Sequence, residues 1–208
     1  LDSLTSTASS VVASARTADI GTTSAAVDAL INTKGLANSS ITLGTVTAGR
    51  DISLTGGTNG IVATSLTAGD DIDVVGSGSA VITSALTTGG SNTGYGDSGY
   101  GSDPSNITLS ATQAMIGTAR AKDNVSLTTI NGTTATALIA DRGAITVRGG
   151  TLAMIDSATT TLANVDIMAN RVTTGTVNAG TDVAIAYVSD ASLGAVTAGT
   201  SIDISGTG

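Results

Sequence analysis

The chain has 208 residues and a formal net charge of −8, and it contains no cysteine and no histidine. The lack of cysteine excludes disulfides and thiolate metal sites, and the lack of histidine removes the commonest general base and metal ligand. The acidic balance argues against binding to nucleic acid or to anionic membranes.

Residues 1–40 are the least regular part of the sequence. Apolar residues recur at Val11, Ile20, Val27 and Leu30, but the corners between them are indistinct. We expect irregular early coils over this stretch. It opens with no basic-then-apolar signal peptide, and the chain has no apolar run of transmembrane length, so we expect no membrane insertion.

From residue 41 onward, a four-residue phrase returns about every 20 residues. It usually consists of a polar turn residue, a β-branched residue, a polar residue and an aliphatic residue, as in Asp51-Ile52-Ser53-Leu54. The copies begin at Asp51, Asp71, Asn106, Asn124, Ala144, Asn164, Asp182 and Ser201. A fixed period in this range is typical of a solenoid, in which each repeat is one coil stacked on the next.

Each copy of the phrase alternates apolar and polar residues, so that Ile52 and Leu54 point to one face and Ser53 to the other. Period-two alternation with β-branched residues predicts strands rather than helices. Crossovers between parallel strands are overwhelmingly right-handed. We therefore predict an all-β fold, a right-handed parallel β-helix (β-solenoid) with about 18–20 residues per coil over residues 41–208.

Other columns repeat with the same period. Val81 lies 20 residues after Ile61, and Leu86 lies 20 residues after Leu66, which predicts that each pair shares a column. A second phrase, Thr-Ala-Gly, recurs beside the first, and we expect its glycine to allow the positive φ angles of sharp corners.

An insertion interrupts the period between Ile72 and Ile107, where the step is 35 residues. The extra residues fall at about 91–105, which predicts a loop extruded from one corner. This stretch is rich in glycine and serine and carries two of the three tyrosines. Tyrosine on such a background is common recognition chemistry, which makes the loop a candidate contact site. Its contact residues would be Tyr95, Asp97, Tyr100 and Asp103; the alternative is a tolerated surface insertion.

The first position of the phrase predicts a turn ladder, in which each side chain caps the local backbone or its neighbour in the stack. Its members are Asp51, Asp71, Asn106, Asn124, Asn164 and Asp182. The alternative is a row of carboxylates that binds cations, with calcium at Asp70-Asp71-x-Asp73. Because asparagine shares the column with aspartate, we favour the structural interpretation and expect no metal and no cofactor.

One pair of neighbouring residues is compatible with a catalytic site. Arg50 lies beside Asp51, and parallel β-helix polysaccharide lyases combine aspartates, calcium and a basic residue. Such pairs are ordinary on solvated corners, and aromatic residues that would stack on sugars make up only 1% of the chain. We expect no catalytic residues.

The repeats resemble those of filamentous haemagglutinin-type bacterial exoproteins, as seen in Leu66-Thr67-Ala68-Gly69-Asp70-Asp71-Ile72-Asp73-Val74 and in Ala140-Asp141-Arg142-Gly143-Ala144-Ile145-Thr146-Val147. The resemblance covers about residues 41–90 and 105–208. It implies a right-handed β-helical shaft that a bacterium secretes and either holds at its cell surface or assembles outside the cell. The secretion domain of that family is not visible here.

The expected function is therefore the structural shaft of a large secreted or surface adhesin, or of an extracellular filament, in cell adhesion or biofilms. One alternative is a module that binds a glycan or a partner through the Gly/Tyr loop. Another is the stalk of a contact-dependent toxin-delivery exoprotein. Because the phrase runs to Ser201-Ile202-Asp203-Ile204, we expect a segment of a longer protein. Its partners would be further coils or other copies end to end, and a receptor or glycan on a host or neighbouring cell.

Overall fold

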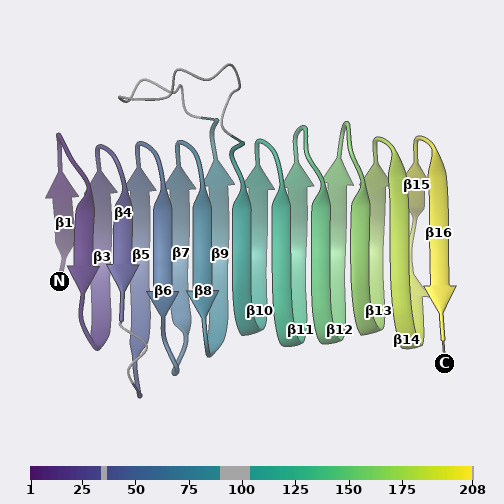
Figure 1. The fold of residues 1–208 in the computed structure, drawn as a ribbon, viewed down its shortest axis with the longest axis horizontal. Coiled ribbons are helices and arrows are strands. Elements are labelled where there is room, and N and C mark those ends of the chain that lie inside the picture. Colours follow the sequence, from purple (N-terminus) through teal and green to yellow (C-terminus); the bar gives the residue numbers. More distant parts are fainter. Residues whose placement is uncertain (34–36, 90–103, 208) are drawn as a thin grey trace.

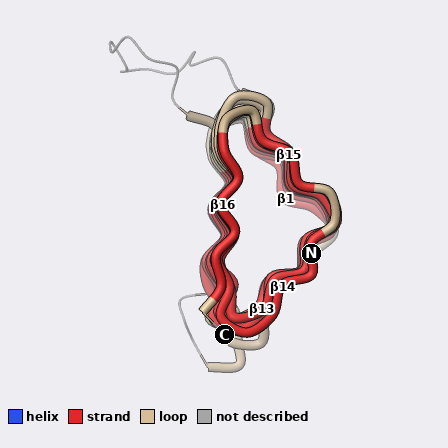
Figure 2. Tube along the Cα trace, turned by 90° about the vertical axis from the view of Figure 1, so that its right-hand side faces the viewer, coloured by secondary structure: helices blue, strands red, loops and turns tan. Residues whose placement is uncertain are grey.

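The computed structural model describes residues 1–33, 37–89 and 104–207. These residues form strands joined by turns and contain no helix. All of the strands belong to one sheet of parallel neighbours, which winds into stacked coils around a narrow core (Figures 1 and 2). The predicted β-solenoid is confirmed.

Sixteen strands make up the described part of this sheet. They are β1 (Ser3–Ser6), β2 (Val11–Ser14), β3 (Thr17–Ala25), β4 (Ala29–Asn32), β5 (Ser40–Ala48), β6 (Ile52–Gly56), β7 (Ile61–Ala68), β8 (Ile72–Gly76), β9 (Ser79–Thr87), β10 (Ile107–Ala121), β11 (Val125–Ala140), β12 (Ile145–Thr160), β13 (Val165–Ala179), β14 (Asp182–Leu193), β15 (Val196–Ala198) and β16 (Ser201–Gly206).

Two rows of strands build the N-terminal coils and then merge. The short strands β2, β4, β6 and β8 pair in one row, and β1, β3, β5, β7 and β9 pair in the other. Strand β10 pairs with β8 along its first residues and with β9 along the rest. From β10 to β13 each coil is a single strand of 15 or 16 residues, bent at the corner.

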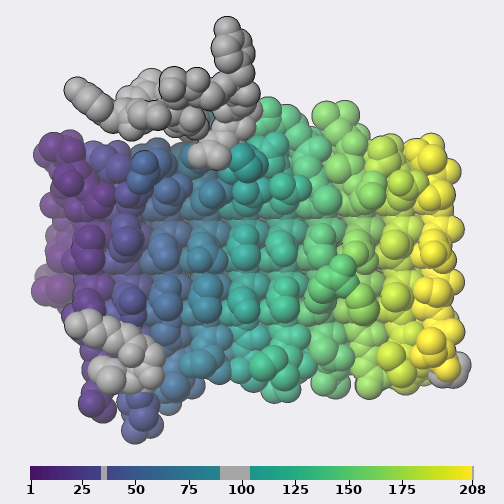
Figure 3. Space-filling model, in the orientation of Figure 1, coloured from purple at the N-terminus to yellow at the C-terminus, as the bar shows by residue number. Residues whose placement is uncertain are grey.

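The core is a set of aliphatic columns that run along the axis of the rod. Ile52 lies beside Ile72, which lies beside Ile107, followed by Val125, and each is at most 2% exposed. This inward column of the repeated phrase was predicted and is confirmed. It ends at Ile202, which is half exposed because no described coil covers it. On the outside, side chains also form rows along the rod (Figure 3).

Two predicted column partners are wrong. Ile61 pairs with Ala80 rather than with Val81, and Leu66 pairs with Ala85 rather than with Leu86. Gly56 pairs with Gly76 and Ile61 pairs with Ala80, so the chain has one residue fewer between these positions in the later coil. A slip of one residue moves a side chain to the opposite face of a strand, so Val81 and Leu86 point outward.

Residues 1–40 also contain strands. Strands β1 to β4 lie there, and they continue the same two rows. Ala18 pairs with Ile41, and Ala29 pairs with Ile52, so small alanines occupy core columns that larger residues fill in later coils.

The glycines of the Thr-Ala-Gly phrase serve close stacking rather than positive φ angles. A Cβ on Gly49 would lie 2.1 Å from the carbonyl oxygen of Ala26, and one on Gly69 would lie 2.0 Å from that of Gly49. Neither glycine has a positive φ; within the described residues the glycines that do are Gly56, Gly57, Gly60 and Gly89. Each corner glycine is therefore required because the preceding coil leaves no room for a side chain.

Candidate functional site

The predicted contact residues of the inserted loop cannot be placed. Tyr95, Asp97, Tyr100 and Asp103 lie outside the described residues. The chain enters the insertion after β9 and leaves it before β10, and these two strands pair directly with each other. The stack of coils is therefore continuous across the point of insertion.

The six residues of the predicted turn ladder lie at one corner, at the start of successive phrase strands. Five of them accept a hydrogen bond from a backbone N–H of the next coil, and Asp182 accepts one from a side chain of the next coil. The Asp71 N–H donates to Asp51 Oδ1 over 3.2 Å, the Asn106 N–H to Asp71 Oδ1 over 2.8 Å, and the Asn124 N–H to Asn106 Oδ1 over 3.2 Å. The Asn124 amide also donates to Asn106 Oδ1 over 2.8 Å. The hydrogen bonds therefore run parallel to the axis.

Ala144 interrupts this ladder. Its N–H donates to Asn124 Oδ1 over 2.9 Å, but alanine has no acceptor to offer the coil beyond. The ladder resumes where the Asp182 N–H donates to Asn164 Oδ1 over 3.4 Å and the Ser201 hydroxyl donates to Asp182 Oδ1 over 2.6 Å. Side chains that bind backbone in this way act as spacers between coils.

Ion pairs also join neighbouring coils. Each pair links a cation to an aspartate one coil away, and in the described residues these pairs are Arg50–Asp28 at 2.8 Å, Arg120–Asp141 at 3.1 Å, Lys122–Asp141 at 3.5 Å, Arg142–Asp123 at 3.0 Å, Arg148–Asp166 at 3.0 Å and Arg171–Asp190 at 3.6 Å. Because the cation of each pair is exposed to solvent, each pair contributes about 0–1 kcal/mol. All of these pairs join one coil to its neighbour along the axis of the rod, so they also favour a fixed register between coils.

The acidic stretch Asp70-Asp71-x-Asp73 was the alternative calcium site. Asp70 accepts a hydrogen bond from the Ser105 hydroxyl over 3.0 Å, and Asp71 accepts from Asn106. Partial burial, and then the charge of Asp71, raise the pKa of Asp73. Across the described part of the chain, no three carboxylates are grouped so as to hold a metal ion. The carboxylates Asp70 and Asp71 thus bind the next coil.

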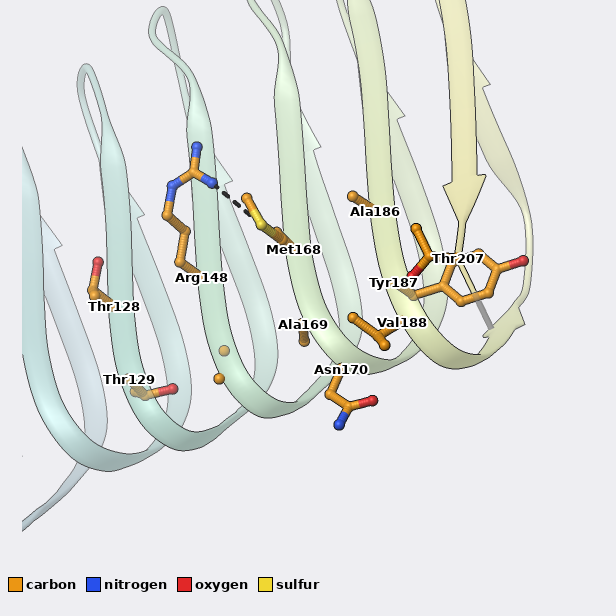
Figure 4. A pocket seen from close by; sticks show the side chains of 12 residues that line it. Thr128, Thr129, Arg148, Met168, Ala169, Asn170, Ala186, Tyr187, Val188 and Thr207 are labelled. Atoms are coloured by element: carbon orange, nitrogen blue, oxygen red, sulfur yellow. Dashed lines mark hydrogen bonds between the residues drawn. The ribbon is translucent and has the colours of Figure 1, made fainter.

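A shallow groove of about 450 Å³ lies at the opposite corner, between β11 and the last described coil. Its residues include Arg148, Gly149, Gly150, Met168 and Tyr187 (Figure 4). The surface is mostly apolar, and the guanidinium that borders it is already paired with a carboxylate.

Sequence reasoning missed this groove. The signal was Gly149-Gly150, at a corner where the preceding coil has Thr129-Ile130 and the next has Ala169-Asn170. Two adjacent residues without side chains leave a hollow in the ridge that the other coils form.

No protein-family model matches the chain, and no curated protein or solved structure is significantly similar to it. The described residues include no helix long and apolar enough to cross a membrane.

Proposed function

We propose that this chain is a structural shaft, part of a large secreted or surface bacterial adhesin or of an extracellular filament, and that it has no catalytic activity. The observation that carries the proposal is the continuous axial stack. Ten strands on the phrase-bearing face, from β2 to β16, pair in parallel without interruption over the described residues.

The polar contacts support the same function. The corner ladder and the cross-coil ion pairs all join one coil to the next along the rod. In a repeat protein each coil contacts only its neighbours, so such contacts resist bending and shear between coils. A rod of ten coils would extend roughly 45–50 Å at about 4.8 Å per coil. Length and stiffness are the properties that a shaft needs.

Removal of one coil tests this function. Deletion of residues 125–144 removes one complete repeat and lets Ile145 follow directly on the corner before Val125. If the chain is a shaft, the variant folds, shortens by about 4.8 Å, and adhesion of cells that carry it is retained. Loss of adhesion in a folded variant would contradict the proposal, because it would place the binding surface on the coils themselves.

Deletion of residues 93–103 distinguishes the alternative binding module. The turn between β7 and β8 occupies the same corner and has only two residues between Ala68 and Asp71. The residues that remain after the deletion are therefore enough to close the turn between β9 and β10. The shaft function predicts unchanged stability and unchanged adhesion. Loss of adhesion with unchanged stability would instead support binding through the Gly/Tyr loop.

A further inference from the structure

The corner that bears the groove also carries the most exposed isoleucine of the described residues. The Ile130 side chain is 72% exposed, and it lies one coil before the hollow at Gly149-Gly150. The Ile130 carbonyl lies so close to Gly150 that a Cβ there would come within 1.8 Å of its oxygen. A protruding apolar side chain and an apolar hollow are therefore adjacent in one row.

The charges at this corner are balanced. Within the described residues, the stretches 128–132, 149–152, 168–170 and 186–189 contain no charged side chain. Arg148 and Arg171 border them, and each is paired with an aspartate of the next coil. On a chain with a net charge of −8, this is a place where two copies can approach with little repulsion.

On both sides of the corner, strands β11, β12 and β13 pair with a neighbour on each flank, so the backbone of these flanking residues is used within the stack. What the corner itself presents to a partner is the mostly apolar hollow, which fits an uncharged apolar side chain. The chain itself carries such a side chain in Ile130.

We propose that this corner is a lateral contact between two copies of the chain. In an antiparallel pair, a two-fold axis that crosses the corner between Ile130 and Gly150 places the isoleucine of each copy in the hollow of the other, beside Met168 of the next coil. Both contacts are equivalent, as an isologous interface requires. Ile130, Gly150 and Met168 lie on three successive coils, which span two coil steps or roughly 10 Å. A patch of this length is smaller than a standard interface, so the dimer is weak.

Sedimentation equilibrium over a wide concentration range tests the proposal. The chain should dimerise reversibly, and Ile130→Asp or Ile130→Lys should each weaken dimerisation at least about tenfold, because an apolar contact is replaced by repulsion between like charges. An equimolar mixture of the two variants should recover association. Circular dichroism should show that both variants fold, because Ile130 is exposed in the single chain.

Val62→Asp is the matched control. Val62 is 46% exposed and lies three coil steps before the coil of Ile130, in the row that leads to Thr134, so its substitution should leave dimerisation unchanged. A chain that stays monomeric at all concentrations would overturn the proposal. Association that Ile130→Asp leaves intact would also overturn it. Such association would have to use another surface, such as the ends of the rods, which do not include this residue.

Discussion

The coils on the two sides of the insertion turn the same corner by different means. In residues 37–89, a glycine-rich turn separates strand β6 from β7, and Gly56, Gly57 and Gly60 have positive φ angles. In β10 to β13 the strand continues through the corner, with an irregularity in register such as that between Gly149 and Leu152. The core columns are the same in both regions.

The corner ladder differs in the same way. Its acceptors before the insertion are the carboxylates of Asp28, Asp51 and Asp71. After the insertion they are mostly neutral amides, from Asn106, Asn124 and Asn164, followed by the carboxylate of Asp182. The comparison teaches that the aliphatic columns determine the fold, while the corners determine local stability. Because its strands are shorter, we expect the N-terminal region to open first.

The largest expected effect comes from a charge in the core. Ile72→Asp and Ile145→Asp should each cost about 4 kcal/mol or more, because each buries a carboxylate without a partner. Hydrogen exchange should show that Ile72→Asp leaves β11 to β13 protected, whereas Ile145→Asp exposes both regions. The reverse pattern would contradict the order of stability.

Gly69→Ala should cost about 2 kcal/mol or more, since the added Cβ meets the Gly49 carbonyl and the coils must separate. Gly76→Ala is the control, because the nearest atom there is the end of the flexible Ile61 side chain at 3.3 Å. Urea denaturation compares the two. Equal effects would show that the spacing between coils does not explain the Thr-Ala-Gly phrase.

Thr23→Val and Thr174→Val should each stabilise the chain by about 1 kcal/mol. Their hydroxyl oxygens are buried without a hydrogen-bond partner, one in each region. Thr129→Val should destabilise it, because the Thr129 hydroxyl is 3.0 Å from that of Thr133. Melting temperatures of the three variants provide the check, and a loss of stability in the first two would mean that their hydroxyls have partners.

Ala144→Asn should restore the missing acceptor of the ladder and stabilise the C-terminal region by about 0.5–1 kcal/mol. Ala144→Val adds bulk without an acceptor and controls for packing. If both substitutions have the same effect on urea denaturation, the ladder contributes no stability.

Asp73→Thr should have the smallest effect, a gain below about 1 kcal/mol at neutral pH. Burial raises the pKa of Asp73 in the folded chain, so the ionised form costs stability above that pKa, and protonation removes the cost as the pH falls. The difference between variant and parent should therefore vanish in acid. Thr108 occupies the same row, which shows that threonine fits. A difference that is independent of pH would exclude a charge effect.

The long aliphatic residues of the phrase made the fold predictable, because β-branched alternation at a steady period has few other solutions. Register in β9 was not predictable from the period, since Val81 and Leu86 matched the spacing while Ala80 and Ala85 filled the core. The hollow at Gly149-Gly150 depends on the side chains of neighbouring coils, so it required the three-dimensional register. The role of the chain in a cell leaves no comparable pattern in sequence.

The central claim is one unbroken stack that continues across the insertion. Ser53 and Ala184 lie in the same outward row, six coil steps apart, and they flank the point of insertion. Because the chain has no cysteine, spin labels can be attached at Ser53→Cys and Ala184→Cys alone. Pulsed electron resonance should give a narrow distribution centred near 29 Å between the labelled backbones, at about 4.8 Å per step. A broad distribution, or one centred far from this distance, would contradict the account.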